Sequence, residues 1–175
     1  MLERQAFVTP LPTLQDIGLS PEALSDVSPH EIATAWFNVF SGAIASRDLS
    51  SFDELLFPGA VWRDLFALTW DIRSITGIPS IRNALDACLA PQAFSVRAFT
   101  SQELALDNHA WAPSLVRPLP DVVWIQMGFA LETGSGTGIG CVRLVPCADG
   151  KWKAFVVLSN LSGLKGYPSL VRLYY

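Results

Sequence analysis

The sequence is short of charge. Only 16% of its 175 residues are charged, against roughly 25% in an ordinary soluble domain, whereas half are hydrophobic. The chain therefore has few charged residues with which to cover its surface, and some apolar side chains are expected to lie on it. This balance predicts the wall of a large cavity, an oligomer interface, or a face that once covered another domain.

Basic residues are few and long apolar runs are missing. The 12 Lys and Arg are scattered among 16 Asp and Glu, which gives a net charge of −4. Phosphate binding needs a basic stripe, so nucleic acid is not an expected partner. No run approaches the roughly 18 apolar residues of a membrane span, and the start MLERQAFV lacks the pattern of a signal peptide. We therefore expect a cytoplasmic protein with no membrane partner.

Cysteine and histidine are also sparse. Cys88, Cys141 and Cys147 form no CxxC pair, which argues against a disulfide framework or a zinc site. The two histidines, His30 and His109, belong to no HExxH motif, and no serine or cysteine stands in a nucleophile elbow. We therefore expect neither a metal nor another cofactor.

Helical signals come first in the chain. Residues 1–27, with three prolines, indicate an extended arm that leads into a short helical turn. Ser28-Pro29-His30-Glu31 then combines an N-cap, a proline at the first helical position and a capping-box acid, which predicts a helix that ends near Arg47. Two further helices are expected, from Ser51 to before Pro58 and from about Pro79 to Leu89.

Strand signals follow after about residue 93. The segments FSVRAFT, VVWIQMGFALE, IGCVRLVPC and KWKAFVVLSNL are rich in β-branched and aromatic residues. Residues 28–175 are therefore predicted to form a single α+β domain, in which three to four helices close a curved, mostly antiparallel sheet into a cone. The stretch GSGTGIG, residues 134–140, fails the GxGxxG pattern and is predicted to be a flexible loop between strands.

The stretch VWRDLFALTWDIRS, residues 61–74, places charges in an apolar segment. With a period of two, Asp64 falls on an aromatic face between Trp62 and Phe66. A lone carboxylate there pairs with a cation, accepts hydrogen bonds, or exchanges a proton near neutral pH as a catalytic acid or base. These three alternatives stay open.

The same stretch suggests two Asp–Arg pairings, Arg63 with Asp64 and Asp71 with Arg73. The second pair falls on the more polar face, and a turn near Thr69 would break the register in any case. We therefore predict that Asp71 and Arg73 form a structural ion pair.

Other candidate site residues are spread along the chain. His109, in a predicted loop beside Trp111, is either a lid residue that carries a proton or an ordinary surface histidine. Gln126 and Asn160 are amides on otherwise apolar strand faces, where they can orient a ligand carbonyl. Seven aromatic residues are candidates for a substrate-binding cavity wall or for core packing: Trp36, Phe40, Trp62, Phe66, Trp70, Trp124 and Trp152.

Three phrases carry a resemblance to a known family. FPGAVWRDLFALTWDIRSITG, GCVRLVPCADGKWKAF and LSGLKGYP resemble the N-terminal domain of fungal flavin-containing monooxygenases, over residues 30–168. That domain has the nuclear transport factor-like fold of ketosteroid isomerases, scytalone dehydratases and polyketide cyclases. The dinucleotide-binding modules of those monooxygenases follow the GLKGYP-like phrase, whereas this chain stops at Tyr175. The resemblance therefore implies a stand-alone relative that does not bind flavin, and a homodimer through the outer face of the sheet.

The resemblance also bears on the site. Asp64 stands where ketosteroid isomerases have their catalytic aspartate, whereas Phe40 stands where they have the tyrosine that binds the oxyanion. An oxyanion hole of that type is therefore not expected.

Two functions follow as hypotheses. The first is a cofactor-free isomerase or cyclase, including a Diels–Alder-type pericyclase, acting on an apolar terpenoid or polyketide intermediate in fungal secondary metabolism. Gln126 or Asn160 would then polarise a carbonyl, and Asp64 would be the base if the reaction moves a proton. The alternative is a non-catalytic ligand-binding or dimerisation module derived from a monooxygenase. A closed pocket of several hundred Å³, lined by Trp and one polar group, favours the enzyme, and a collapsed interior favours the module.

Overall fold

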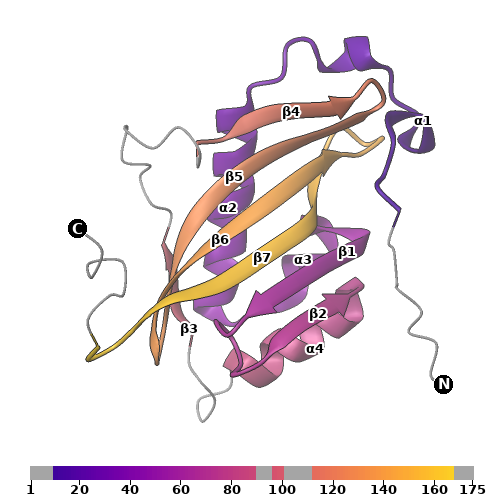
Figure 1. The fold of residues 1–175 in the computed structure, drawn as a ribbon. Helices are drawn as coiled ribbons and strands as arrows, with labels where there is room; N and C mark the ends of the chain where they lie inside the picture. The colour runs from indigo at the N-terminus through magenta and orange to yellow at the C-terminus, as the bar shows by residue number, and fades with distance from the viewer. Residues whose placement is uncertain (1–9, 90–95, 101–111, 168–175) are drawn as a thin grey trace, which may run out of the picture.

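Helices cover one side of a strongly curved sheet (Figure 1). The computed structural model describes residues 10–89, 96–100 and 112–167. None of the helices in these ranges combines the length and apolar character needed to cross a membrane. The helical elements are α1 (Leu14–Ile17), η1 (Pro21–Leu24), α2 (Pro29–Ser46), η2 (Leu49–Ser51), α3 (Phe52–Leu55) and α4 (Ile78–Leu89). The strands are β1 (Leu56–Leu65), β2 (Ile72–Thr76), β3 (Val96–Thr100), β4 (Ser114–Leu119), β5 (Val122–Thr133), β6 (Gly136–Pro146) and β7 (Trp152–Leu164).

The long helix α2 begins and ends where the sequence predicts. The Ser28 hydroxyl accepts a hydrogen bond from the Glu31 amide, and Pro29 opens the first turn. The helix stops at Arg47, whose φ of 59° is left-handed. The N-terminus thus follows from a local sequence signal, whereas arginine is not a usual residue at a left-handed helix end.

The described strands form one mixed sheet, in the order β2-β1-β7-β6-β5-β3, with β4 also paired to β5. The parallel pair is β1 with β7, and the other pairings among the described strands are antiparallel. This confirms the predicted α+β architecture with a mostly antiparallel sheet. The strand β4 was not expected from the sequence, because it contains Pro118, which cannot donate to a ladder and is tolerated at a sheet edge.

The prediction of a flexible glycine loop at residues 134–140 is wrong. Only Gly134 and Ser135 separate β5 from β6, and the following glycines belong to β6. A Cβ atom at Gly140 would lie 2.1 Å from the Phe129 ring, and one at Gly138 would lie 2.3 Å from the backbone oxygen of Asn160. Glycine occurs here because neighbouring groups lie directly against the strand, not because the chain turns.

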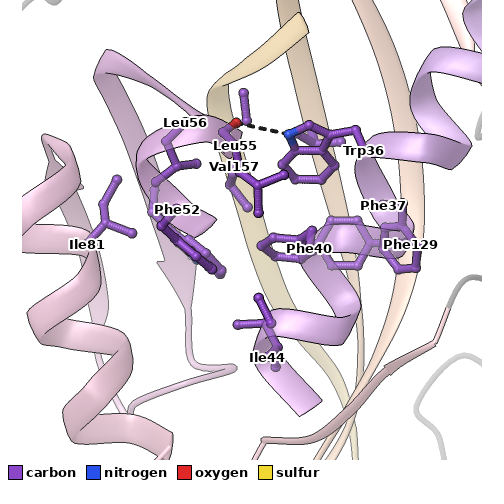
Figure 2. Packing of buried hydrophobic residues seen from close by; sticks show 14 of the residues in the cluster. Trp36, Phe37, Phe40, Ile44, Phe52, Leu55, Leu56, Ile81, Phe129 and Val157 are labelled. Carbon is purple, nitrogen blue, oxygen red and sulfur yellow. Dashed lines mark hydrogen bonds between the residues drawn. The ribbon is translucent and has the colours of Figure 1, made fainter. Parts of the chain in front are cut away.

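The space between α2 and the sheet is filled by aromatic side chains. Phe40 is fully buried at the centre of this cluster (Figure 2). It stacks on Trp36 at 4.7 Å between ring centroids and also contacts Trp62 and Phe129, at 5.9 Å and 6.0 Å. The indole nitrogen of Trp36 donates to the Leu55 carbonyl at 2.9 Å. The inner face of the sheet is therefore covered by a packed core where α2 lies against it.

Two glycine variants test this packing. We expect Gly140→Ala to lower the free energy of unfolding by about 1–3 kcal/mol, because its methyl group overlaps the Phe129 ring. Gly42→Ala, in α2 where a Cβ meets nothing within 4 Å, is the control and should raise it by roughly 0.5–1 kcal/mol. Urea unfolding curves measure both, and equal effects of the same sign would contradict the packing argument.

Candidate functional site

A cavity of about 340 Å³ lies between the β1–β2 hairpin and α4. Trp62 and Asp64 of β1 form part of its wall, together with Leu68 to Trp70 of the connecting loop. Arg73 of β2 also lines it. Trp70 and the Arg73 side chain are 55% and 56% exposed, so they mark its mouth, whereas Trp62 and Asp64 are buried at its inner end.

The helix α4 supplies the opposite wall. Ile81, Ala84, Leu85 and Cys88 line the cavity, and their spacing of three and four residues places them on one face of the helix. Ile81 and Leu85 are almost fully buried. The wall is therefore mostly apolar, and its shape depends on how the hairpin is held against α4.

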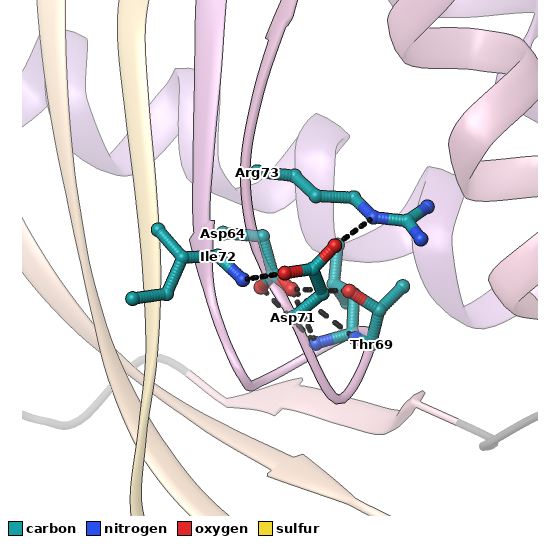
Figure 3. A network of polar contacts seen from close by, with 6 residues as sticks. Asp64, Thr69, Asp71, Ile72 and Arg73 are labelled. Atoms are coloured by element: carbon teal, nitrogen blue, oxygen red, sulfur yellow. Dashed lines mark hydrogen bonds and ion pairs between the residues drawn. The ribbon is translucent and has the colours of Figure 1, made fainter.

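Asp64 is 1% exposed, and its carboxylate is surrounded by hydrogen-bond donors. The Leu68 and Thr69 amides donate to it at 3.1 Å each and the Thr69 hydroxyl at 3.3 Å (Figure 3). The Ser159 hydroxyl donates to it at 2.6 Å. Ser159 in turn accepts a hydrogen bond from the indole nitrogen of Trp62 at 2.9 Å. Since a carboxylate has about four acceptor positions, these donors occupy all of them. Of the three alternatives from the sequence, acceptance of hydrogen bonds is the one observed.

These bonds hold the loop that connects β1 to β2. The strand β1 ends at Leu65, and Phe66 has a φ of 61°, which is rare for a residue with a bulky side chain. The period of two predicted through residue 74 therefore stops at Leu65, and Phe66 is exposed instead of facing inward with Asp64. The amides of Leu68 and Thr69 turn back toward Asp64, so the carboxylate acts as a clamp on the loop.

The two predicted Asp–Arg pairings have different outcomes. Asp71 and Arg73 form the predicted ion pair, with 3.3 Å between Oδ2 and Nε, and both side chains are more than half exposed. Arg63 does not pair with Asp64 and donates to the Ser74 hydroxyl at 3.2 Å.

Gln126 lies on the other face of the sheet from the cavity. Its neighbours Ile125 and Met127 belong to the core, so Gln126 points outward with Trp124. There its amide oxygen accepts a hydrogen bond from Arg143 at 3.0 Å, and the Arg143 guanidinium lies 4.7 Å from the Trp124 ring centroid.

Asn160 is also turned away from the cavity. The register of β7 shifts between Ala154 and Val156 relative to β6, so residues beyond this irregularity exchange faces. Val157 and Ser159 therefore point inward, and Asn160 points outward. Sequence reasoning missed Ser159 because an unbroken alternation through β7 places it on the outer face.

Of the seven aromatic candidates, Trp62 and Trp70 line the cavity. His109 lies outside the described residues. The other five aromatic residues lie in the core, on the outer face or in the exposed loop: Trp36, Phe40, Trp152, Trp124 and Phe66. Thr69, Arg73 and Cys88 were not expected from the sequence to form part of a cavity wall.

The thiol of Cys88, on α4, is a further titratable group in the cavity wall besides Asp64 and Arg73. Burial raises its pKa, and the nearby Asp64 charge acts in the same direction. The thiol is therefore protonated at neutral pH and is a weak nucleophile. In the part of the chain that the structure describes, no three His, Cys, Asp or Glu side chains gather as metal ligands.

Comparisons with known proteins bear on the fold. Neither the models of protein families nor the sequences of curated proteins give a match. A nuclear transport factor 2-like protein with a cystatin-like fold from Novosphingobium aromaticivorans is similar in structure, with a TM-score of 0.54 and 12% identity over 93% of this chain and 97% of that one. ActVI-ORFA from Streptomyces coelicolor has a TM-score of 0.53 and 10% identity, over 75% and 95% of the two chains. A provisional scytalone dehydratase from N. aromaticivorans has a TM-score of 0.51 and 11% identity, over 79% and 87%.

At these identities the comparisons show the fold alone. The chain has the nuclear transport factor 2-like fold, as the resemblance in the sequence implied. The more specific resemblance to the N-terminal domain of fungal monooxygenases finds no support among these structures and stays a prediction.

Removing the Ser159 hydroxyl tests the clamp. We expect Ser159→Ala to lower the free energy of unfolding by about 1.5–3 kcal/mol, because it removes a bond to a buried carboxylate and the acceptor of the Trp62 indole. Ser162→Ala removes an exposed hydroxyl of the same strand and should change it by less than about 0.5 kcal/mol. Chemical denaturation measures both variants, and matching values would show that the Asp64 cluster does not stabilise the hairpin.

Proposed function

We propose that this protein is a cofactor-free isomerase or cyclase that folds an apolar small molecule inside the cavity between the β1–β2 hairpin and α4. The observation that carries the proposal is the cavity itself, at about 340 Å³. Its size falls within the range of roughly 300–1,000 Å³ that is typical of ligand pockets. Its wall is mostly apolar, with Trp62, Trp70 and few polar groups. A terpenoid or polyketide intermediate of fungal secondary metabolism is the substrate class that the sequence resemblance favours.

The arrangement favours catalysis by shape over catalysis by proton transfer. Asp64 has donors on every acceptor position, so it would have to release the loop before it could take a proton from a substrate. A pericyclic ring closure needs no such proton transfer. It needs a wall that holds a flexible molecule in a near-attack conformation, and such positioning accelerates a reaction strongly.

One polar group can assist such a reaction. Gln126 and Asn160, the donors expected from the sequence, lie on the opposite face of the sheet. Arg73 lies in the cavity wall and can donate to a substrate carbonyl, which would stabilise charge that develops on the oxygen. In this proposal Arg73, and not Gln126 or Asn160, polarises the substrate carbonyl.

A second candidate function is a non-catalytic ligand-binding module. The observation that favours it is the chemical inertness of the described wall, in which Asp64 is fully hydrogen-bonded and the Cys88 thiol is protonated. For both candidate functions we also propose a homodimer that forms through the outer face of the sheet. Sedimentation equilibrium measures the mass of the assembly in solution.

Filling the cavity tests whether it binds apolar molecules. N-phenyl-1-naphthylamine is neutral and fluoresces when it enters an apolar site. We expect saturable binding to the wild type and an affinity lower by at least about tenfold in Ala84→Phe, because the added ring occupies the cavity. Ala45→Phe adds the same ring to the exposed side of α2 and should bind like the wild type. Unchanged binding in Ala84→Phe would remove the basis of the proposal.

Turnover separates the enzyme from the binding module. Purified protein is incubated with apolar metabolites from the source organism after deletion of the gene, and products are compared by mass spectrometry. We expect a product of unchanged mass with the wild type and Ala45→Phe but not with Ala84→Phe.

The variant Asp64→Asn separates the two kinds of chemistry in the same assay. If shape drives the reaction, product formation by this variant follows its remaining affinity for N-phenyl-1-naphthylamine. A variant that binds the dye but forms no product would identify Asp64 as the base. Dye binding without any product from the wild type would support the binding module.

A further inference from the structure

Asp64 and Arg73 face each other across the β1–β2 hairpin without forming a salt bridge. The antiparallel register pairs them directly, so their side chains leave the same face of the sheet. Opposed residues have Cβ atoms about 4.5–5.5 Å apart, a distance at which opposite charges ordinarily pair. Here the Asp64 carboxylate bonds to the loop and to Ser159, whereas Arg73 bonds to Asp71.

Because Arg73 bonds to Asp71 through Nε, its terminal N–H groups are left to bind a ligand. Its Nε donates to Asp71, and its two terminal nitrogens have no protein acceptor among the described residues. Figure 3 shows the guanidinium extending away from Asp64. Because Arg73 also lines the cavity, its unused donors lie at the entrance of an apolar space.

The two charged residues of the wall, Asp64 and Arg73, therefore differ in how many hydrogen-bonding groups they leave for a ligand. The carboxylate of Asp64 is buried and already accepts hydrogen bonds from four protein donors. Arg73 is the one cation among the described wall residues, and it is half-exposed with a free fork of N–H groups. A guanidinium fork binds a carboxylate with two parallel hydrogen bonds and is suited to planar anions.

We propose that the cavity binds an apolar acid, with the carboxylate at the mouth on Arg73 and the apolar body between Trp62 and α4. This inference rests on the proposed function, because it names the ligand class of the same cavity. It assigns Arg73 as the residue that selects the acid over a neutral analogue.

Competition with a matched pair of ligands tests the assignment. 1-Naphthylacetic acid and its methyl ester share a ring system and differ in charge, and each is used to displace N-phenyl-1-naphthylamine. We expect the acid to compete about three- to tenfold better than the ester in the wild type, a modest factor because Arg73 is half-exposed. The preference should shrink at high salt.

Two arginine variants identify the residue responsible. Arg73→Gln should abolish the preference for the acid. Arg82→Gln removes the same charge from α4, where Arg82 pairs with Asp53 outside the cavity wall, and should retain the preference. Binding of the neutral dye to each variant shows that the cavity is intact.

The outcomes separate this inference from the proposed function. Equal competition by acid and ester in the wild type, or a preference that survives in Arg73→Gln, overturns the inference and leaves the apolar cavity in place. Dye binding that is unaffected by Ala84→Phe overturns both, since the ligand would then lie elsewhere.

Discussion

The hydrogen bonds between the Asp64 carboxylate and the loop after β1 are the constraint on which the cavity depends. They hold the backbone at Leu68 and Thr69, and they stabilise the left-handed conformation of Phe66, which costs roughly 1–3 kcal/mol and persists only when its surroundings fix it. With the loop held in this way, Trp70 lies at the mouth and Leu68 in the wall. The carboxylate for which the sequence leaves three alternatives open therefore holds the loop by accepting hydrogen bonds.

This constraint links the fold to the proposed chemistry. The interior beneath α2 is filled by the aromatic cluster around Phe40, so the space for a ligand lies to one side, against α4. The strand β1, the loop held by Asp64 and the apolar face of α4 form its wall. Such a site offers shape and one guanidinium, which suits positioning of an apolar molecule better than proton transfer.

Much of the fold was readable from the sequence, whereas little of the site was. The start of α2 could be predicted because the cap at Ser28 acts through neighbouring residues. The wall of the cavity depends on irregularities that alternation cannot show, namely the end of β1 at Leu65 and the register shift in β7 that turns Ser159 inward. The glycines of β6 led to a wrong prediction of a loop. Glycine is also required where neighbouring groups lie directly against a strand, and the sequence does not distinguish the two cases.

A crystal structure of the protein with N-phenyl-1-naphthylamine tests the central claim most directly. The account predicts the dye between Trp62 and α4, with the bonds from Leu68, Thr69 and Ser159 to Asp64 intact. A dye bound on the outer face of the sheet would contradict the cavity as the ligand site. A dye in the cavity whose amine replaces the loop donors on Asp64 would contradict the clamp.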